Sequence, residues 1–152
     1  MTIKKTILAT VVGAFTLIGA QSATAEVLRM GVEGAYPPFS QKEADGTLSG
    51  FDIDIALAIC AELERECELV EQEWDGMIPA LIARKYDAIV ASMSITEDRR
   101  QQVDFSESYY NTPSRFIAAE GATFELTQEG TAGLAIGVLR GTTLQCYVEK
   151  HM

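Results

Sequence analysis

The sequence is poor in the residues that build metal centres and nucleic-acid surfaces. It has one histidine and three cysteines, and its 12 basic side chains are outnumbered by 22 acidic ones. The only histidine, His151, lies far along the chain from Cys60 and Cys67, so a metal site is not expected. The net charge of −10 disfavours non-specific binding to nucleic acid or to an anionic membrane surface. We expect no metal, no other cofactor and no nucleic-acid partner.

Long apolar runs are also scarce, and the one that is present lies at the N-terminus. Lys4 and Lys5 precede an apolar stretch over residues 7–20, and the small-x-small sequence Ala-Thr-Ala follows at 23–25. This is the order of a secretory signal peptide. The stretch is 14 residues long, shorter than the roughly 20 residues that span a bilayer as a helix. We therefore predict a signal peptide at 1–25, cleavage after Ala25 and export to the periplasm, rather than a membrane anchor.

Residues 26–152 contain no internal repeat, no low-complexity tract and no later apolar run long enough to insert into a membrane. They carry 10 basic and 22 acidic residues, a net charge of −12. Strand-like and helix-like segments alternate, which favours an α/β fold with a parallel sheet. Residues 120–133 have the composition of a linker between two lobes. Strands are predicted at 27–32, 67–72, 86–94, 114–121 and 135–141, and helices at 51–66, 74–85, 96–103 and 142–150.

Two early segments carry more specific expectations. Residues 33–50 are predicted to be a loop, in which Asp45-Gly46 forms a tight turn. The helix that follows is amphipathic, and we predict that its apolar stripe is the buried face. That stripe consists of Ile55, Ile59 and Leu63.

Cys60 and Cys67 lie seven residues apart, at the end of this predicted helix. In a continuous helix their Cα atoms would be about 10.5 Å apart, whereas a disulfide needs roughly 4.4–6.8 Å. A disulfide therefore requires the helix to end between them, near Glu64 and Arg65, and the chain to turn back into a strand. The alternative is two free thiols on a helix. An oxidising compartment favours the disulfide.

An arginine occupies an unusual position after the third predicted strand. Thr96 has the place of a helix N-cap, so Arg99 falls in the first turn, where the helix dipole favours anions over cations. Ser92 and Ser94 lie just before it. A ligand anion between these groups would explain the arginine, because its planar fork suits a carboxylate. The alternative is a solvated arginine that interacts with the acidic residues beside it.

Other strand ends of the predicted sheet also carry candidate binding residues. In open α/β sheets, ligands bind beyond the carboxyl ends of the strands and against helix N-termini. Glu33 and Tyr36 follow the first strand, and a carboxylate with an aromatic ring suits a cation. Thr143 lies at the start of the last helix. Together with Arg99, these positions fit a zwitterion that carries an additional positive charge.

Each of these residues also has a purely structural explanation. In that interpretation the polar residues are strand-end hydroxyls, surface charges and a helix cap, and the rings of Tyr36 and Trp74 belong to the core. Taken singly, the residues indicate little. Only their joint position at the strand ends favours a binding site.

A resemblance adds to this interpretation. The segment GFDIDIALAICAEL at 50–63 is similar to the signature of the family 3 extracellular solute-binding proteins, the receptors of polar amino-acid ABC importers. The similarity continues through the stretches YPPFS, WDGMIPALIARKYDAIVASMSITEDRR, VDFSESYYNTPSRF and GVLRGTT, and it covers nearly all of 26–143. The greatest likeness is to the binders of lysine, arginine, ornithine and histidine and to their opine-binding relatives.

The resemblance implies a site for an amino acid. In the family, the arginine that matches Arg99 grips the α-carboxylate of the ligand, helped by the positions of Ser94 and Thr143. The position of Ser92 helps to hold the α-amino group. The resemblance also implies that the Cys60–Cys67 pair forms a disulfide.

The side-chain end of the implied site departs from the family in places. The positions of Tyr36 and Trp74 sandwich the ligand side chain, and some binders have leucine at the latter. Glu33 would face the distal cation, where basic amino-acid binders more often carry Asp. Ala91 and Leu144 stand where those binders often have Ser and Gln. The resemblance therefore implies a basic amino acid and leaves the choice among arginine, lysine, ornithine and histidine open.

Family members have two lobes joined by crossing strands, the type II periplasmic-binding-protein fold. On this pattern residues 26–118 form most of lobe one and residues 119–152 only begin lobe two, so we expect an incomplete chain. We expect a receptor, not an enzyme, that delivers its amino acid to an inner-membrane ABC permease. The alternatives are a dehydratase-like enzyme on the same scaffold, a ligand-sensing input domain, and a truncated product without activity.

Overall fold

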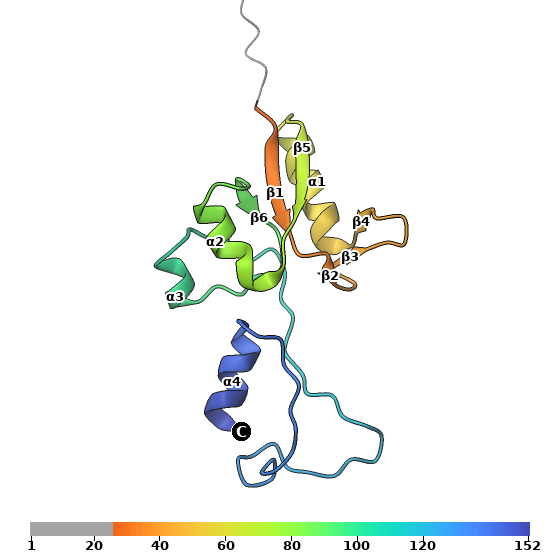
Figure 1. The fold of residues 1–152 in the computed structure, drawn as a ribbon, viewed down its shortest axis with the longest axis vertical. Coiled ribbons are helices and arrows are strands. Elements are labelled where there is room, and N and C mark those ends of the chain that lie inside the picture. Colours follow the sequence, from red (N-terminus) through yellow and green to blue (C-terminus); the bar gives the residue numbers. More distant parts are fainter. Residues whose placement is uncertain (1–25) are drawn as a thin grey trace, which may run out of the picture.

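A three-stranded parallel sheet forms the centre of the N-terminal part of the molecule (Figure 1). The computed structural model describes residues 26–152, so the predicted signal peptide lies outside the described residues. β1 (Leu28–Val32) is the central strand, with β5 (Cys67–Glu71) on one side and β6 (Ala88–Ile89) on the other. Both pairings are parallel. The α/β fold with a parallel sheet is thus confirmed.

A second, antiparallel sheet lies within the segment that was predicted to be a loop. It consists of β2 (Ala35–Tyr36), β3 (Ser40–Lys42) and β4 (Leu48–Ser49). These strands are two or three residues long, too short for an alternating pattern to identify them. The predicted tight turn is present, because Gly46 N donates to Glu43 O over 2.9 Å and Gly46 has a φ of +89°.

Helix α1 (Phe51–Glu62) covers one face of the parallel sheet, but with a different stripe from the predicted one. Its buried residues are Asp52, Ile53, Ala56 and Cys60. Of the predicted face, Ile55 packs against the core, whereas Ile59 and Leu63 are exposed. The prediction was wrong because most of the helix is apolar on all sides, so apolar character does not identify the buried face. The face with the small residues Ala56 and Cys60 packs on the sheet, because small side chains allow a close approach.

The disulfide between Cys60 and Cys67 is present, and helix α1 ends between the two residues, as the geometry of a disulfide requires. Their Cα atoms are 6.1 Å apart. Helix α1 ends at Glu62, and Glu64 turns the chain back with a φ of +50°. The helix is therefore shorter than the predicted 51–66, and the alternative of two free thiols is excluded.

The opposite side of the sheet is covered by the segment from 74 to 86. A 3-10 turn η1 (Trp74–Gly76) leads into α2 (Met77–Ile82). The hydroxyl of the buried Tyr86 donates to Met77 O over 2.6 Å. The ring of Tyr86 lies so close to β1 that a Cβ at Gly31 would stand 2.6 Å from it. Glycine at this position therefore permits the packing of α2 on the sheet.

Residues 114–152 are organised differently. Helix α4 (Thr143–His151) is present, but the strands predicted at 114–121 and 135–141 are not formed. A strand needs a neighbour for its backbone N–H and C=O groups, and no described segment is paired with either stretch. Figure 1 shows both as extended chain beside α4. The division into lobes at 118 and 119 stays a prediction.

Candidate functional site

Arg99 lies in the short helix α3 (Glu97–Arg100), where its guanidinium binds only neutral groups. The side chain of Thr96 caps the helix by accepting from Arg99 N over 3.3 Å, which confirms the predicted N-cap. Arg99 Nη1 donates to Ser94 O over 2.7 Å, and Nη2 donates to Gly141 O over 3.0 Å. Within residues 26–152 no ion pair involves Arg99. Its charge has therefore no anionic partner of its own.

Trp74 and Gly141 complete the surroundings of this guanidinium. The Arg99 carbon Cζ lies 5.4 Å from the centre of the Trp74 ring, a cation–π arrangement. Trp74 Nε1 donates to the same Gly141 carbonyl oxygen over 3.1 Å. Burial lowers the pKa of Arg99, although a guanidinium stays protonated at any physiological pH. One carbonyl oxygen thus holds both the arginine and the indole.

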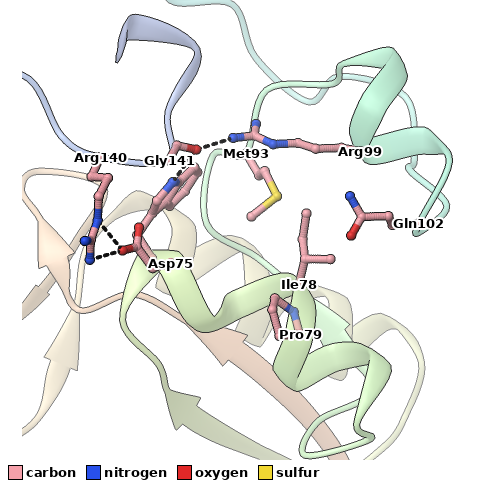
Figure 2. A pocket seen from close by; sticks show the side chains of 9 residues that line it. Asp75, Ile78, Pro79, Met93, Arg99, Gln102, Arg140 and Gly141 are labelled. Carbon is pink, nitrogen blue, oxygen red and sulfur yellow. Dashed lines mark hydrogen bonds and ion pairs between the residues drawn. The ribbon is translucent and has the colours of Figure 1, made fainter. Parts of the chain in front are cut away.

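These groups line a cleft of about 410 Å³, shown in Figure 2. Met93, Ile78 and Pro79 supply its apolar surface. At its edge Arg140 Nε donates to Asp75 Oδ2 over 2.8 Å, an ion pair that joins η1 to the chain just before α4. The size is within the range of small-molecule sites, which is about 300–1,000 Å³.

A second polar group surrounds Ser92, which follows β6. Ser92 has a φ of +52°, a left-handed conformation that is uncommon outside glycine. Its Oγ lies 2.8 and 2.7 Å from the two carboxylate oxygens of Asp52. Tyr109 OH donates to Asp52 Oδ1 over 2.9 Å and accepts from Ser92 N over 3.0 Å. Burial raises the pKa of Tyr109 to about 12.

The acidic side of the candidate site lies at the carboxyl end of β1. Glu33 is 8 % exposed. Burial, with the nearby charge of Asp52, raises the pKa of the Glu33 carboxyl. Tyr36 is exposed and stacks on Phe39 with ring centres 5.0 Å apart. Within the described part of the chain, Glu33 forms no ion pair. A buried acid and an accessible aromatic ring are groups that a cationic ligand would use.

The structure brings some of the predicted site residues together and separates others. Trp74 and Arg99 share the cleft, and Ser94 contributes its carbonyl oxygen to Arg99. Ala91 is buried. Thr143 begins α4 and lines a separate apolar cavity over residues 114–148, not the Arg99 cleft. The roles that the resemblance implied for these residues stay predictions.

Sequence reasoning missed several residues of the arrangement. Asp52 and Tyr109 organise Ser92, and Asp75 pairs with Arg140. Asp52 lies in the GFDID stretch at 50–54. An acidic residue within an otherwise apolar helix was the available signal for a buried polar role. Nothing in the local sequence marks Tyr109, because its contact with Asp52 spans 57 residues.

Comparison with known proteins assigns the family. The sequence profile of the bacterial extracellular solute-binding proteins, family 3, matches residues 28–147. The chain belongs to this family. It is 50 % identical over 125 residues to the L-arginine-binding protein of Pseudomonas aeruginosa, a match that covers 82 % of this chain and 48 % of that protein. The chain spans about half the length of the curated relatives that it matches.

Solved structures agree with this assignment. An ancestral arginine-binding protein bound to arginine aligns with a TM-score of 0.78 and 38 % identity, over 84 % of this chain and 56 % of that one. A mutant of the arginine-bound form of domain 1 from TmArgBP aligns with a TM-score of 0.53 and 39 % identity, over 55 % and 65 %. This chain therefore has the α/β fold of periplasmic binding proteins, as predicted.

Residues 26–152 contain neither a membrane-spanning helix nor a cluster of metal-binding side chains. No described helix combines the length and the apolar character needed to cross a membrane. No group of three or more metal-binding side chains is found among the same residues.

Proposed function

We propose that the chain is the amino-acid receptor of a bacterial ABC importer and that it binds a basic amino acid, with arginine as the first candidate. The observation that carries this proposal is the charge arrangement at the sheet edge. Among residues 26–152, Arg99 is a cation without an anionic partner, and Glu33 is a buried acid without a cationic one. A ligand with a carboxylate at one end and a cation at the other would supply both.

At the carboxylate end, the ligand would replace a neutral acceptor. Arg99 Nη2 now donates to Gly141 O, and a hydrogen bond between two charged groups is roughly twice as strong as one with a neutral partner. A ligand carboxylate is thus a better acceptor than the carbonyl. The ring of Trp74 on the other face of the guanidinium keeps the arginine in place during this exchange.

At the cationic end, the ligand would relieve the cost of burying Glu33. Because burial raises the pKa of this carboxyl, binding of a cation must lower it again and release a proton from any protonated fraction. Affinity for a cationic ligand should therefore rise as the pH rises through the raised pKa of Glu33. A neutral ligand such as glutamine should not show this dependence.

The family and its relatives support the wider role. Family members are described as extracellular solute-binding proteins, and the leader over 1–25 fits export to the periplasm. The receptor performs no reaction; it binds its amino acid and presents it to an inner-membrane permease. The arginine bound in two of the aligned structures supports the ligand class.

Calorimetric titration of the exported chain with arginine, lysine, ornithine, histidine and glutamate tests the proposal. We expect binding of the cationic members and none of glutamate. Arg99→Ala should weaken every amino acid by about 10- to 100-fold, since it removes a charge-assisted pair. Glu33→Gln should weaken only the cationic ones. Arg100→Ala, a neighbouring exposed arginine, is the matched control.

Two results would contradict the proposal. Binding of arginine that is unchanged by Arg99→Ala would exclude this residue as the carboxylate contact. Failure of the folded wild-type chain to bind any member of the panel would exclude a receptor function for the chain as it stands.

A further inference from the structure

A buried carboxylate is hydrogen-bonded to Ser92. Asp52, in the first turn of α1, is 1 % exposed. Both of its oxygens lie within hydrogen-bond distance of Ser92 Oγ, at 2.8 and 2.7 Å, and Tyr109 OH lies 2.9 Å from Oδ1. Ser92 itself is partly exposed. The carboxylate is thus withdrawn from solvent, whereas Ser92 keeps part of its surface exposed.

The direction of these hydrogen bonds follows from a count of the hydrogens. An ionised carboxylate only accepts, and a hydroxyl has a single hydrogen to donate. The hydroxyl hydrogens of Ser92 and Tyr109 must therefore both point at Asp52. The Tyr109 oxygen in turn accepts from Ser92 N over 3.0 Å. Ser92 Oγ keeps its lone pairs and has no hydrogen left for another acceptor.

We propose that Asp52 is a positioning residue that sets the polarity of Ser92, so that the site takes a protonated amino group beside Ser92 and rejects an anion or a hydrogen-bond acceptor there. A donor on the ligand meets a free lone pair and, behind it, a negative charge. An acceptor would meet a lone pair and the same charge, which costs free energy on both counts. The inference rests on the proposed function, since it concerns one end of the same site.

The same network also holds the backbone of Ser92. A φ of +52° is sparsely populated for a residue with a Cβ and persists only when its surroundings fix it. The hydroxyl bonds to Asp52 and the N–H bond to Tyr109 supply that constraint. Ser92→Gly separates the two roles, because glycine adopts this φ without strain and has no hydroxyl.

Two opposing effects act on the Asp52 carboxyl. Burial is the larger and raises its pKa, while the hydrogen bonds from Ser92 and Tyr109 oppose that rise. The two donors therefore support the ionised form that the polarity of Ser92 requires. A ligand cation nearby would add to that support.

The test compares two ligands that differ only in the amino group, arginine and 5-guanidinopentanoate, by calorimetry on the full chain expressed with residues 1–25. In Asp52→Asn the side-chain amide can donate to Ser92 Oγ and release the hydroxyl hydrogen toward the ligand. We expect the affinity for arginine to fall about tenfold while the affinity for the analogue stays nearly constant. Asp54→Asn, the same change at an exposed residue of α1, should alter neither.

Ser92→Gly serves as a second variant that does not depend on the folding of Asp52→Asn. It should lower the preference for arginine over the analogue by a similar factor, and Asp52→Asn should lower the preference less in this background than in the wild-type chain. An equal loss for both ligands in Asp52→Asn, or an unchanged preference in Ser92→Gly, would overturn the inference but leave the receptor function intact. A wild-type chain that binds neither ligand would overturn both.

Discussion

Residues 26–103 and residues 114–152 contain similar apolar side chains, but only the first region buries them. In the first, Met30, Val32 and Met77 are at most 2 % exposed between the sheet and its helices. In the second, Leu134 and Leu139 are 50 % exposed, and Ile117 is 96 % exposed. The difference shows that an apolar stretch forms a strand only where a neighbouring strand pairs with its backbone N–H and C=O groups. The binding groups follow the same division, because most come from the well-packed region.

Truncation of a core side chain should have the largest effect and should distinguish the two regions directly. Met77→Ala removes a fully buried side chain, and large-to-small changes of this kind cost about 2–5 kcal/mol. Leu134→Ala, at a half-exposed position, should cost less than about 1 kcal/mol. Denaturant unfolding followed by circular dichroism measures both. Equal losses would show that residues 114–152 have a core of their own.

Removal of the disulfide should weaken the first region by a smaller amount. The Cys60–Cys67 bond closes a short loop between α1 and β5, and the chain-entropy relation gives roughly 2.5 kcal/mol for a loop of this length. We expect this loss in the free energy of unfolding of the double variant Cys60→Ser/Cys67→Ser. Cys146→Ser changes the exposed free cysteine of the second region and should leave stability unchanged. A loss in the Cys146 variant would contradict the comparison.

Ionisation of Tyr109 should reveal how the connecting segment is attached to the first region. Tyrosine ordinarily titrates near pH 10, and burial raises the pKa of Tyr109 to about 12. Between these values the unfolded chain has lost the proton that the folded chain keeps, so stability should fall as the pH rises from 10 toward 12. Tyr109→Phe should remove this part of the dependence. A tyrosinate absorbance titration should show one group fewer with a high pKa in the variant.

The ion pair that joins the two regions should contribute least to stability. The side chains of Arg140 and Asp75 are 82 % and 44 % exposed in their contact, and exposed pairs contribute about 0–1 kcal/mol. Arg140→Ala should therefore leave the unfolding midpoint nearly unchanged but increase hydrogen exchange in residues 135–145 at low salt. Added salt should produce the same increase in the wild-type chain. A large loss of global stability would show that the pair holds more than the local contact.

The sequence predicted those features that depend on local chemistry. The N-cap at Thr96, the turn at Gly46 and the helix end between Cys60 and Cys67 each follow from residues near one another in the chain. The parallel sheet followed from the alternation of strands and helices. The residues that line the cleft were predicted in part, since Trp74 and Arg99 were both expected to be site residues and both line it.

Features that depend on distant contacts were not predictable in the same way. The buried stripe of α1 is set by how closely the helix approaches the sheet, and an apolar helix does not show this in its periodicity. The hydrogen bond between Asp52 and Tyr109 joins residues that are 57 positions apart, and the local sequence around neither residue indicates it. The strands predicted at 114–121 and 135–141 failed for the related reason that strand propensity does not supply a partner.

The central position of β1 also has a consequence for the order of events in folding. Leu28 pairs with Cys67, 39 residues later, and Met30 pairs with Ala88, 58 residues later. The first strand to be synthesised must therefore wait for two distant segments, and closing loops of this length precedes any gain from the sheet. We therefore expect the parallel sheet to form more slowly than α1 and the antiparallel strands β2, β3 and β4. During that interval β1 has no partner strand, and its backbone N–H and C=O groups stay bonded to water.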